Sequence, residues 1–283
     1  MPELPEVETI VRSLVNGARH NGLHVIRQCI TEVRVLWDRT LANLSPADFT
    51  IQIVGQTIQK VSRRGKFLVF SLNKNTLLMH LRMSGDLRVE EAFAPDGSEA
   101  PLHKHDRLAL LFESGQRLAF NNPRKFGRVW LVEDAQEVLG VLGPEPLDES
   151  LTVDKFHAML QARNRLLKPL LMDQHFLAGL GNIYTDEALF RARLHPRVIS
   201  STLSREQSAL LLREIRCVLK EGIRRNGSSI DWVYRGGDFQ NDFNVYGRAG
   251  ETCPRCGTAI ERLLVGQRGT HICPLCQPLN KTV

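Results

Sequence analysis

Four cysteines near the end of the 283-residue chain have the type and spacing of a metal site. Cys253-x2-Cys256 and Cys273-x2-Cys276 are separated by 16 residues. Each Cys-x2-Cys turn can direct two thiolates at one metal ion, and two such pairs at this separation match a four-cysteine zinc site. Disulfides are the main alternative, but the chain shows no export signal, and disulfides are uncommon inside cells. Four protein ligands leave no open coordination position, so we expect one structural Zn²⁺.

The first residues, MPELPEVET, hold a second group of side chains that could take part in a reaction. Pro5 and Glu6 suit the start of a helix, because proline fits the first helical position and carboxylates face the positive end of the helix dipole. Apolar residues at helical spacing follow and predict a helix from Pro5 to near Asn16. Pro2 and Glu3 lie before this helix, and its start does not explain them. The sequence therefore raises the question of whether the end of the chain itself does chemistry.

The charge of the chain is unevenly distributed. Residues 1–150 hold 18 Lys and Arg against 19 Asp and Glu, whereas residues 151–283 hold 19 against 12. A basic half is typical of proteins with a polyanionic partner, although many mildly basic proteins bind no nucleic acid. No apolar run approaches the length of a membrane span, and no secretory signal is visible. We expect a soluble, intracellular protein.

The elements that must position these residues fall into two classes. After the first helix the apolar periodicity becomes two, which predicts short strands in hairpins and a sandwich or flattened barrel. A segment rich in Gly, Pro and acidic residues at 140–150 indicates a linker, and the pattern from about residue 152 is helical. The predicted strands lie in 25–37, 49–61, 66–72, 76–83, 107–112, 117–121 and 127–133.

The helical half contains two features that could contact a ligand. A glycine-rich turn at 178–182 separates two short helices, so backbone amides there could hold a phosphate, or the segment could be an ordinary helical hairpin. Ser204 to Gln207 fits a capping box that opens a helix through about Arg225. Between the cysteine pairs, ERLLVGQRGTHI predicts a β-hairpin with Arg268 at its tip.

Motifs along the whole chain closely resemble those of the bacterial formamidopyrimidine-DNA glycosylase family (Fpg, or MutM), relatives of endonuclease VIII. The resemblance implies an α+β multidomain fold. A β-sandwich with a leading helix would occupy residues 1–140, a helix–two-turn–helix domain residues 150–245 and a four-cysteine zinc finger residues 246–280. The matching segments are MPELPEVET, RRGKFLVF, HLRMSG, KHD, NPRKFG, LGPEP, KPLLMDQ, AGLGNIYTDEALF, VYGR and CPRCG with QRGTHICPLCQ.

The resemblance implies a bifunctional base-excision-repair enzyme that excises oxidised purines from damaged double-stranded DNA and nicks the strand by β,δ-elimination. Pro2 would be the nucleophile after removal of Met1, and Glu3 the adjacent acid or base. Lys66 would act at a phosphate flanking the lesion, and Arg268 would assist δ-elimination. One chain suffices for this mechanism, so we expect a monomer, in the cytoplasm and associated with the nucleoid through DNA.

Nine further residues lie at positions that, according to the resemblance, contact DNA. Met83, Arg124 and Phe126 would fill the gap left by an extruded base, and Lys168 would face the damaged base and strand. Asn164 departs from the family pattern, which commonly has a basic residue there, so a contact at this position would be weaker or shifted to its neighbouring arginines. The full set is His80, Met83, His105, Arg124, Phe126, Asn164, Lys168, Asn182 and Tyr246.

A second departure concerns the segment 227–244, GSSIDWVYRGGDFQNDFN, which is about four residues shorter than the family loop that closes over flipped 8-oxoguanine. Three functions therefore stay open: excision of 8-oxoguanine and formamidopyrimidines, the same chemistry with a preference shifted to oxidised pyrimidines or hydantoins, and non-catalytic binding of damaged DNA. Intact Pro2, Glu3, Lys66 and Arg268 favour the two catalytic readings.

Overall fold

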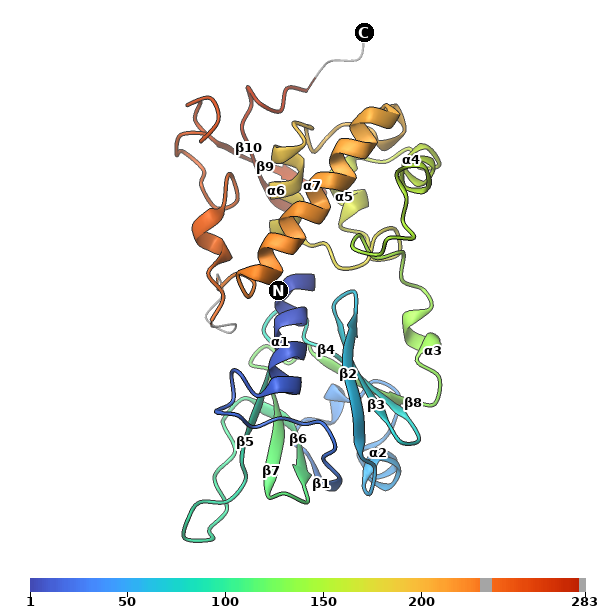
Figure 1. The fold of residues 1–283 in the computed structure, drawn as a ribbon, viewed down its shortest axis with the longest axis vertical. Helices are drawn as coiled ribbons and strands as arrows, with labels where there is room; N and C mark the ends of the chain where they lie inside the picture. Colours follow the sequence, from blue (N-terminus) through green and yellow to red (C-terminus); the bar gives the residue numbers. More distant parts are fainter. Residues whose placement is uncertain (230–235, 280–283) are drawn as a thin grey trace. The chain divides into compact units, whose positions relative to one another are not determined.

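The computed structural model describes residues 1–229 and 236–279, and the chain divides into two compact units (Figure 1). The first unit is built on residues 1–141 and the second on residues 142–228 and 237–279. Within the described residues, no helix has both the length and the apolar character needed to cross a membrane. The expected α+β architecture, with N-terminal sheets, a helical part and a C-terminal hairpin, is confirmed.

The first unit is a sandwich of two four-stranded sheets whose hydrogen-bonded neighbours are all antiparallel. One sheet has the order β1-β6-β7-β5 and the other the order β2-β3-β4-β8. Turns at residues 73–75 and 113–115 join β3 to β4 and β6 to β7. The strands are β1 (Ile30–Val35), β2 (Ile58–Arg64), β3 (Phe67–Leu72), β4 (Thr76–His80), β5 (Asp86–Glu91), β6 (Asp106–Phe112), β7 (Gln116–Asn121) and β8 (Arg128–Val132).

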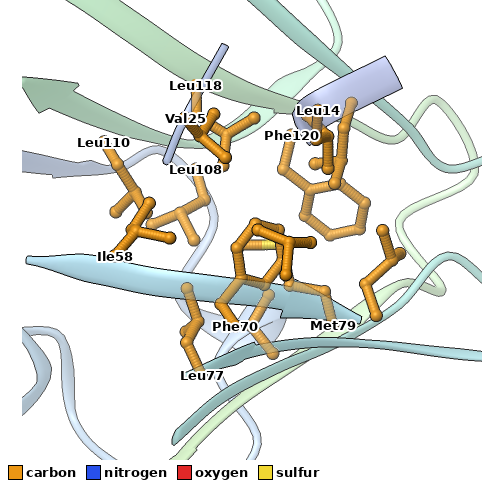
Figure 2. Close-up of a cluster of buried hydrophobic side chains, with 14 of the residues drawn as sticks. Leu14, Val25, Ile58, Phe70, Leu77, Met79, Leu108, Leu110, Leu118 and Phe120 are labelled. Carbon is orange, nitrogen blue, oxygen red and sulfur yellow. The ribbon is translucent and has the colours of Figure 1, made fainter. Parts of the chain in front are cut away.

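Apolar side chains of both sheets form one core, in which Leu77 and Phe70 of one sheet lie near Leu108 and Phe120 of the other (Figure 2). Alternation explains this arrangement, because every second residue of a strand points to the same face. β3 shows this alternation clearly, with Leu68, Phe70 and Leu72 buried. Burial of such side chains stabilises the fold by about 1.5–3 kcal/mol each.

The leading helix α1 (Leu4–Asn16) packs against β2 and β3. Its apolar stripe places Val7, Ile10 and Leu14 in the core, as the helical spacing predicts. The helix ends at Gly17, whose φ of 73° requires the left-handed conformation that glycine adopts without strain. The predicted extent of this helix is therefore confirmed, and it fixes the direction from which Pro2 and Glu3 enter the fold.

The prediction of a strand throughout 49–61 is wrong for its first half, which belongs to helix α2 (Pro46–Ile53). Ser45 caps this helix by accepting the Asp48 N–H, and Pro46 occupies the first turn. Phe49 and Ile53, four residues apart, are buried, whereas Ile51 is 78% exposed. The same three apolar residues fit a period of two or of four. The cap at Ser45 is compatible with the helix, and packing of Phe49 and Ile53 in the core selects it. The unit also contains two short elements, η1 (Asp38–Thr40) and α3 (Gln136–Leu139).

In the second unit, α6 (Asn182–Arg191) packs against α5, α7 and β10, and its residues from Ile183 to Phe190 are all buried. The predicted capping box of Ser204 and Gln207 opens α7, as expected. Gly222 of α7 allows close packing, because a Cβ there would lie 2.5 Å from the Tyr184 ring. The elements are α4 (Val153–Gln161), α5 (Leu167–Leu171), α6 (Asn182–Arg191), η2 (Ser200–Thr202), α7 (Arg205–Arg224), η3 (Phe239–Asp242), β9 (Glu261–Val265) and β10 (Arg268–Ile272).

Candidate functional site

The N-terminal residues are held by a capping arrangement at the start of α1. Pro2 is buried, and Glu3 occupies the N-cap position with 2% of its surface exposed. The Glu3 backbone N–H donates to Glu6 Oε2 at 2.8 Å, and Glu6 is also buried. Glu6 therefore satisfies a donor that the helix itself leaves unpaired, and it fixes the backbone immediately after Pro2.

Lys66 lies in the two-residue turn between β2 and β3, after Gly65 with φ of 56°. Only 4% of Lys66 is exposed. Arg63 of the same hairpin donates to Glu8 Oε2 of α1 at 2.8 Å, and this ion pair joins the end of β2 to the helix. The ion pair between Arg63 and Glu8 and the packing of α1 on β2 and β3 place the hairpin that contains Lys66 and the N-terminal helix in the same unit, in contact with each other.

His80 ends β4 as a buried, neutral ring. Its Nδ1 accepts the Arg82 backbone N–H at 3.0 Å, and Phe67 packs edge-on against it. Burial, together with the charges of Arg82 and Lys66, lowers the pKa of His80 to about 3. Because Nδ1 is an acceptor, the ring proton resides on Nε2, so His80 can donate a hydrogen bond without carrying charge.

Met83 and Arg124 lie in contact on two turns of the first unit, and Phe126 follows Arg124 two residues later in the sequence. Arg124 Nη1 lies 3.8 Å from Met83 Sδ, and the Arg124 backbone N–H donates to Ser84 Oγ at 3.2 Å. Met83 is 41% exposed and Phe126 is 58% exposed. The two turns thus present an apolar surface with one guanidinium beside it.

His105 is half-buried and supports the second of these turns. Its carbonyl oxygen accepts the Asn122 backbone N–H at 2.8 Å, and its Nδ1 lies 3.4 Å from Arg107 Nη2. Asn122 in turn touches Ser84, with 3.5 Å between Ser84 Oγ and Asn122 Oδ1. Gly127 is required at the end of this turn, since a Cβ there would lie 2.0 Å from Asn122 Nδ2.

The second unit places Asn164 and Lys168 very differently. Asn164 is exposed, and its Oδ1 accepts from Ser201 Oγ at 3.5 Å. Lys168 has no exposed surface, and its ammonium group donates to Asp186 Oδ1 at 2.6 Å. The expectation that Lys168 faces a damaged base does not fit this placement, because a side chain buried against a carboxylate is not presented to a ligand.

Helix α6 supplies the polar side chains that hold strand β10 and the loop at residues 244–246. Asn182, half-buried at its first position, donates from Nδ2 to the Gly269 carbonyl oxygen at 3.0 Å. Glu187 accepts the backbone N–H groups of Asn244, Val245 and Tyr246, each at 2.9 or 3.0 Å. The half-buried Tyr246 is thereby fixed through its own backbone, on a carboxylate that is itself buried.

Arg268 is exposed at the tip of the β9–β10 hairpin, as the sequence predicts. Gly266 and Gln267 form the turn, both with positive φ (55° and 63°), which matches the twist of the two strands. The hairpin places the guanidinium at the end of a paired, supported structure.

The four clustered cysteines fit one metal ion. Their Sγ atoms all lie within 4.8 Å of one another. Individual separations of 3.4 Å (Cys256 to Cys273) and 3.9 Å (Cys253 to Cys276) bracket the ~3.8 Å expected between ligands of a tetrahedral zinc site with Zn–S bonds of about 2.3 Å. Backbone N–H groups of Arg255 and Cys276 donate to two of the sulfurs, as is usual for thiolates. One structural Zn²⁺ therefore fits this site.

Three family models match successive parts of the chain. The formamidopyrimidine-DNA glycosylase N-terminal domain matches residues 1–129, its H2TH domain residues 142–233, and the zinc finger found in FPG and IleRS residues 250–279. The formamidopyrimidine-DNA glycosylase of Protochlamydia amoebophila is 42% identical over 286 residues, covering 98% of this chain and 99% of the relative. The chain belongs to the formamidopyrimidine-DNA glycosylase family. The resemblance seen in the sequence is thereby confirmed.

Other members of the formamidopyrimidine-DNA glycosylase family agree in sequence and in structure. The enzyme of Chloroflexus aurantiacus is 45% identical, covering 98% of both chains. The Lactococcus lactis Fpg (MutM), solved in complex with DNA containing N7-benzyl-Fapy-dG, superposes with a TM-score of 0.87 at 36% identity, over 98% of this chain and all of that chain. The same protein solved with DNA containing an abasic site also gives a TM-score of 0.87.

Sequence reasoning missed the two adjacent carboxylates of α6, Asp186 and Glu187. Both lie in the segment AGLGNIYTDEALF (178–190), and both are buried with their oxygens occupied by hydrogen bonds to segments far along the chain. A possible signal was their position on a helix whose other residues are mostly apolar, where a buried carboxylate must find partners.

Proposed function

We propose that this chain flips and excises oxidised purines, 8-oxoguanine and formamidopyrimidines, from double-stranded DNA, with Pro2 as the nucleophile. The observation that carries the proposal is the arrangement at the start of α1. Pro2 directly precedes Glu3, and the Glu3 backbone is fixed by the buried Glu6 carboxylate at 2.8 Å. Removal of Met1 would give Pro2 a free amine, next in sequence to the Glu3 carboxyl group, at the start of a packed helix.

The class of enzyme follows from membership of the family. The chain is a bifunctional base-excision-repair enzyme, which hydrolyses N-glycosyl bonds of damaged bases and cleaves DNA at the resulting abasic sites. The matched four-cysteine finger is consistent with one structural zinc ion. We further propose a cytoplasmic, monomeric enzyme with domains at residues 1–140, 150–245 and 246–280.

Pro2 is suited to attack on a sugar carbon once Met1 has been removed. An α-amine titrates near 7.7–8.0, against about 10.4 for a lysine, so about a tenth of it is unprotonated at pH 7. The nitrogen forms a bond to C1′ while the bond from C1′ to the damaged base breaks. A secondary amine gives a permanently cationic iminium, which accepts the electron pair released when the C2′ proton leaves. That step starts β-elimination and expels the 3′ phosphate.

Three further residues have roles in this scheme. Glu3, a carboxyl group beside the amine, exchanges a proton with the sugar ring oxygen as the ring opens, and such transfer contributes about 10²–10⁴-fold to a rate. Lys66 acts at a phosphate flanking the lesion. Arg268 neutralises the phosphate that leaves in δ-elimination, when the bond from C5′ to oxygen breaks.

The exposed side chains of Met83, Arg124 and Phe126 fit the gap that a flipped base leaves. Extruding a base requires a few kcal/mol of lost stacking and pairing. An apolar wedge offsets part of this loss, and a guanidinium can hydrogen-bond the orphaned base. The contact between Arg124 and Met83 keeps both functions on one surface. His80, His105, Asn164, Asn182 and Tyr246 would contact the DNA backbone or the bases around this position.

Borohydride trapping tests the proposal. Protein whose intact mass shows that Met1 is absent should form a covalent adduct with a duplex containing 8-oxoguanine after reduction of the iminium. Protein that retains Met1 should form none, because the Pro2 nitrogen is then an amide. The absence of an adduct with processed protein, despite binding of the duplex, would overturn the catalytic assignment.

A second candidate concerns the lesion and rests on the short segment 227–244. Its residues 230–235 lie outside the described part of the chain. A shorter loop would close less fully over a flipped purine, which would favour oxidised pyrimidines or hydantoins. Single-turnover excision of 8-oxoguanine and of dihydrouracil from otherwise identical duplexes distinguishes the two preferences, since the sugar chemistry is the same for both.

A further inference from the structure

We propose that Asp186 is a positioning residue for Arg268. It acts through Lys168 and Thr270, and it sets the efficiency of δ-elimination separately from base excision. The proposal rests on the proposed function in one respect, namely that Arg268 acts in δ-elimination. Every residue that carries the argument lies in the second unit.

Arg268 needs support from outside its own hairpin. It is exposed, and the turn that precedes it contains only Gly266 and Gln267. A two-stranded hairpin is at best marginally stable by itself in water. Its register pairs Arg268 with Val265, and the next contacts that could fix its direction come from α5 and α6.

Asp186 joins the hairpin to helix α5. One carboxylate oxygen, Oδ1, accepts from Lys168 Nζ at 2.6 Å, while the other, Oδ2, accepts the His271 backbone N–H at 2.9 Å. The His271 ring contributes too, with Nδ1 3.3 Å from Oδ2. Lys168 and the Asp186 side chain have no exposed surface. The carboxylate therefore holds β10 directly through its backbone and also orients the lysine.

Lys168 extends this link to the backbone of Arg268 itself. Its ammonium donates to Thr270 Oγ1 at 2.8 Å, and the same hydroxyl donates to the Arg268 carbonyl oxygen at 3.0 Å. The ammonium also lies 3.2 Å from the Gly269 carbonyl oxygen. A continuous series of hydrogen bonds thus runs from Asp186 through Lys168 and Thr270 to Arg268.

Two further contacts show that this part of the hairpin is tightly seated. Asn182 Nδ2 donates to the Gly269 carbonyl oxygen at 3.0 Å. At the tip, a Cβ on Gly266 would lie 2.7 Å from Pro169 Cγ, so the turn sits directly against the residue after Lys168. The direction of Arg268 is therefore set by α5 and α6, which are about 80 to 100 residues distant in sequence.

Because the ion pair between Lys168 and Asp186 is buried, it is stable in only one geometry. Taking two charges out of water gives little net stability, and the arrangement persists only where geometry and additional hydrogen bonds compensate. Here the ammonium has three oxygen acceptors and the carboxylate has backbone and side-chain donors. Such a saturated network allows one hairpin orientation, and displacement of a reacting group by about 1 Å can reduce a rate by about 100-fold.

The test compares Asp186→Asn and Thr270→Val with the wild-type enzyme on a duplex containing an abasic site. Asp186→Asn keeps an acceptor for the His271 N–H but removes the charge that orients Lys168. Thr270→Val removes only the hydroxyl that reaches the Arg268 carbonyl. In both variants the ratio of δ- to β-elimination product should fall about tenfold or more, while borohydride trapping stays within about twofold of wild type.

Asp154→Asn is the matched control, because Asp154 forms an exposed ion pair with Arg205 in the same unit. It should leave the product ratio unchanged. Zinc content and the thermal transition are measured for every variant. A wild-type product ratio in both folded variants would overturn the proposal. Loss of zinc or of the fold in both would also contradict it, since the effect is then on the metal site and not on the direction of Arg268.

Arg268→Ala separates this inference from the proposed function. If Arg268→Ala leaves the product ratio unchanged, the role of Arg268 in δ-elimination is wrong. If Arg268→Ala lowers the ratio while Asp186→Asn and Thr270→Val do not, Arg268 acts as proposed and Asp186 does not position it. If all three lower the ratio, combining Asp186→Asn with Arg268→Ala should have no further effect, because both changes remove the same contribution.

Discussion

The hydrogen bond between the Glu3 backbone and the Glu6 carboxylate offers a sharp test of how α1 positions the N-terminus. Glu6→Ala removes the acceptor of a buried N–H, and an unsatisfied buried donor destabilises a protein by about 1–3 kcal/mol. The observed bond is 2.8 Å long, and both residues are 2% exposed, so water cannot readily replace the lost carboxylate. We therefore expect the free energy of unfolding to fall by about 1–3 kcal/mol.

The same change should slow the chemistry more than it weakens DNA binding. Without Glu6 the backbone before α1 gains freedom, and misplacement of a reacting group by about 1 Å can reduce a rate by about 100-fold. Single-turnover borohydride trapping on saturating duplex should thus be slower by about 10- to 100-fold. Glu6→Gln is the matched control, because its amide oxygen can still accept the Glu3 N–H, and most of the rate should return.

Two results would refute this reasoning. A wild-type trapping rate for Glu6→Ala would mean that the hydrogen bond does not position Pro2 and Glu3. Equal losses in Glu6→Ala and Glu6→Gln would mean that the negative charge of Glu6 matters, and not its role as an acceptor. Urea unfolding of each variant, followed by fluorescence, establishes whether the altered rate accompanies a loss of stability.

Three further outcomes follow from the structure. Cys253→Ser should reduce zinc content and weaken DNA binding while leaving trapping at saturating DNA unchanged, and normal zinc with wild-type affinity would contradict the four-cysteine site. Phe126→Ala should change stability by no more than about 0.5 kcal/mol, because the ring is 58% exposed, yet slow excision of a paired lesion about tenfold more than cleavage at an abasic site. Since burial lowers the pKa of His80 to about 3, its neutral ring contributes stability that is complete above pH 6.5 and is lost as the pH falls toward 3. In His80→Gln, the free energy of unfolding, measured with urea at a series of pH values, should accordingly fall less steeply as the pH is lowered from 6.5 to 4. The same pH dependence in the variant and the wild type would show that the ring is not buried as a neutral group.

The sequence by itself determined the features that depend on near neighbours. The Cys-x2-Cys pairs, the helix from Pro5 to near Asn16, and the capping box of Ser204 each rest on residues within a few positions of one another, whereas the role of Glu3 as the N-cap of α1 came from the structure. Local geometry is sufficient there, because a cap or a metal turn is completed by three or four consecutive residues. The motifs that resemble the family are equally local, and they sufficed to identify it.

The tertiary structure decided which of several locally permitted states each remaining residue adopts. Phe49 and Ile53 fit either a strand or a helix, and packing of α2 on the core selected the helix. Lys168 resembles an exposed basic residue in sequence, but its partners Asp186 and Thr270 lie 18 and 102 residues away. A charged side chain can be buried only where distant segments supply its hydrogen bonds, and that condition is met only once the chain has folded.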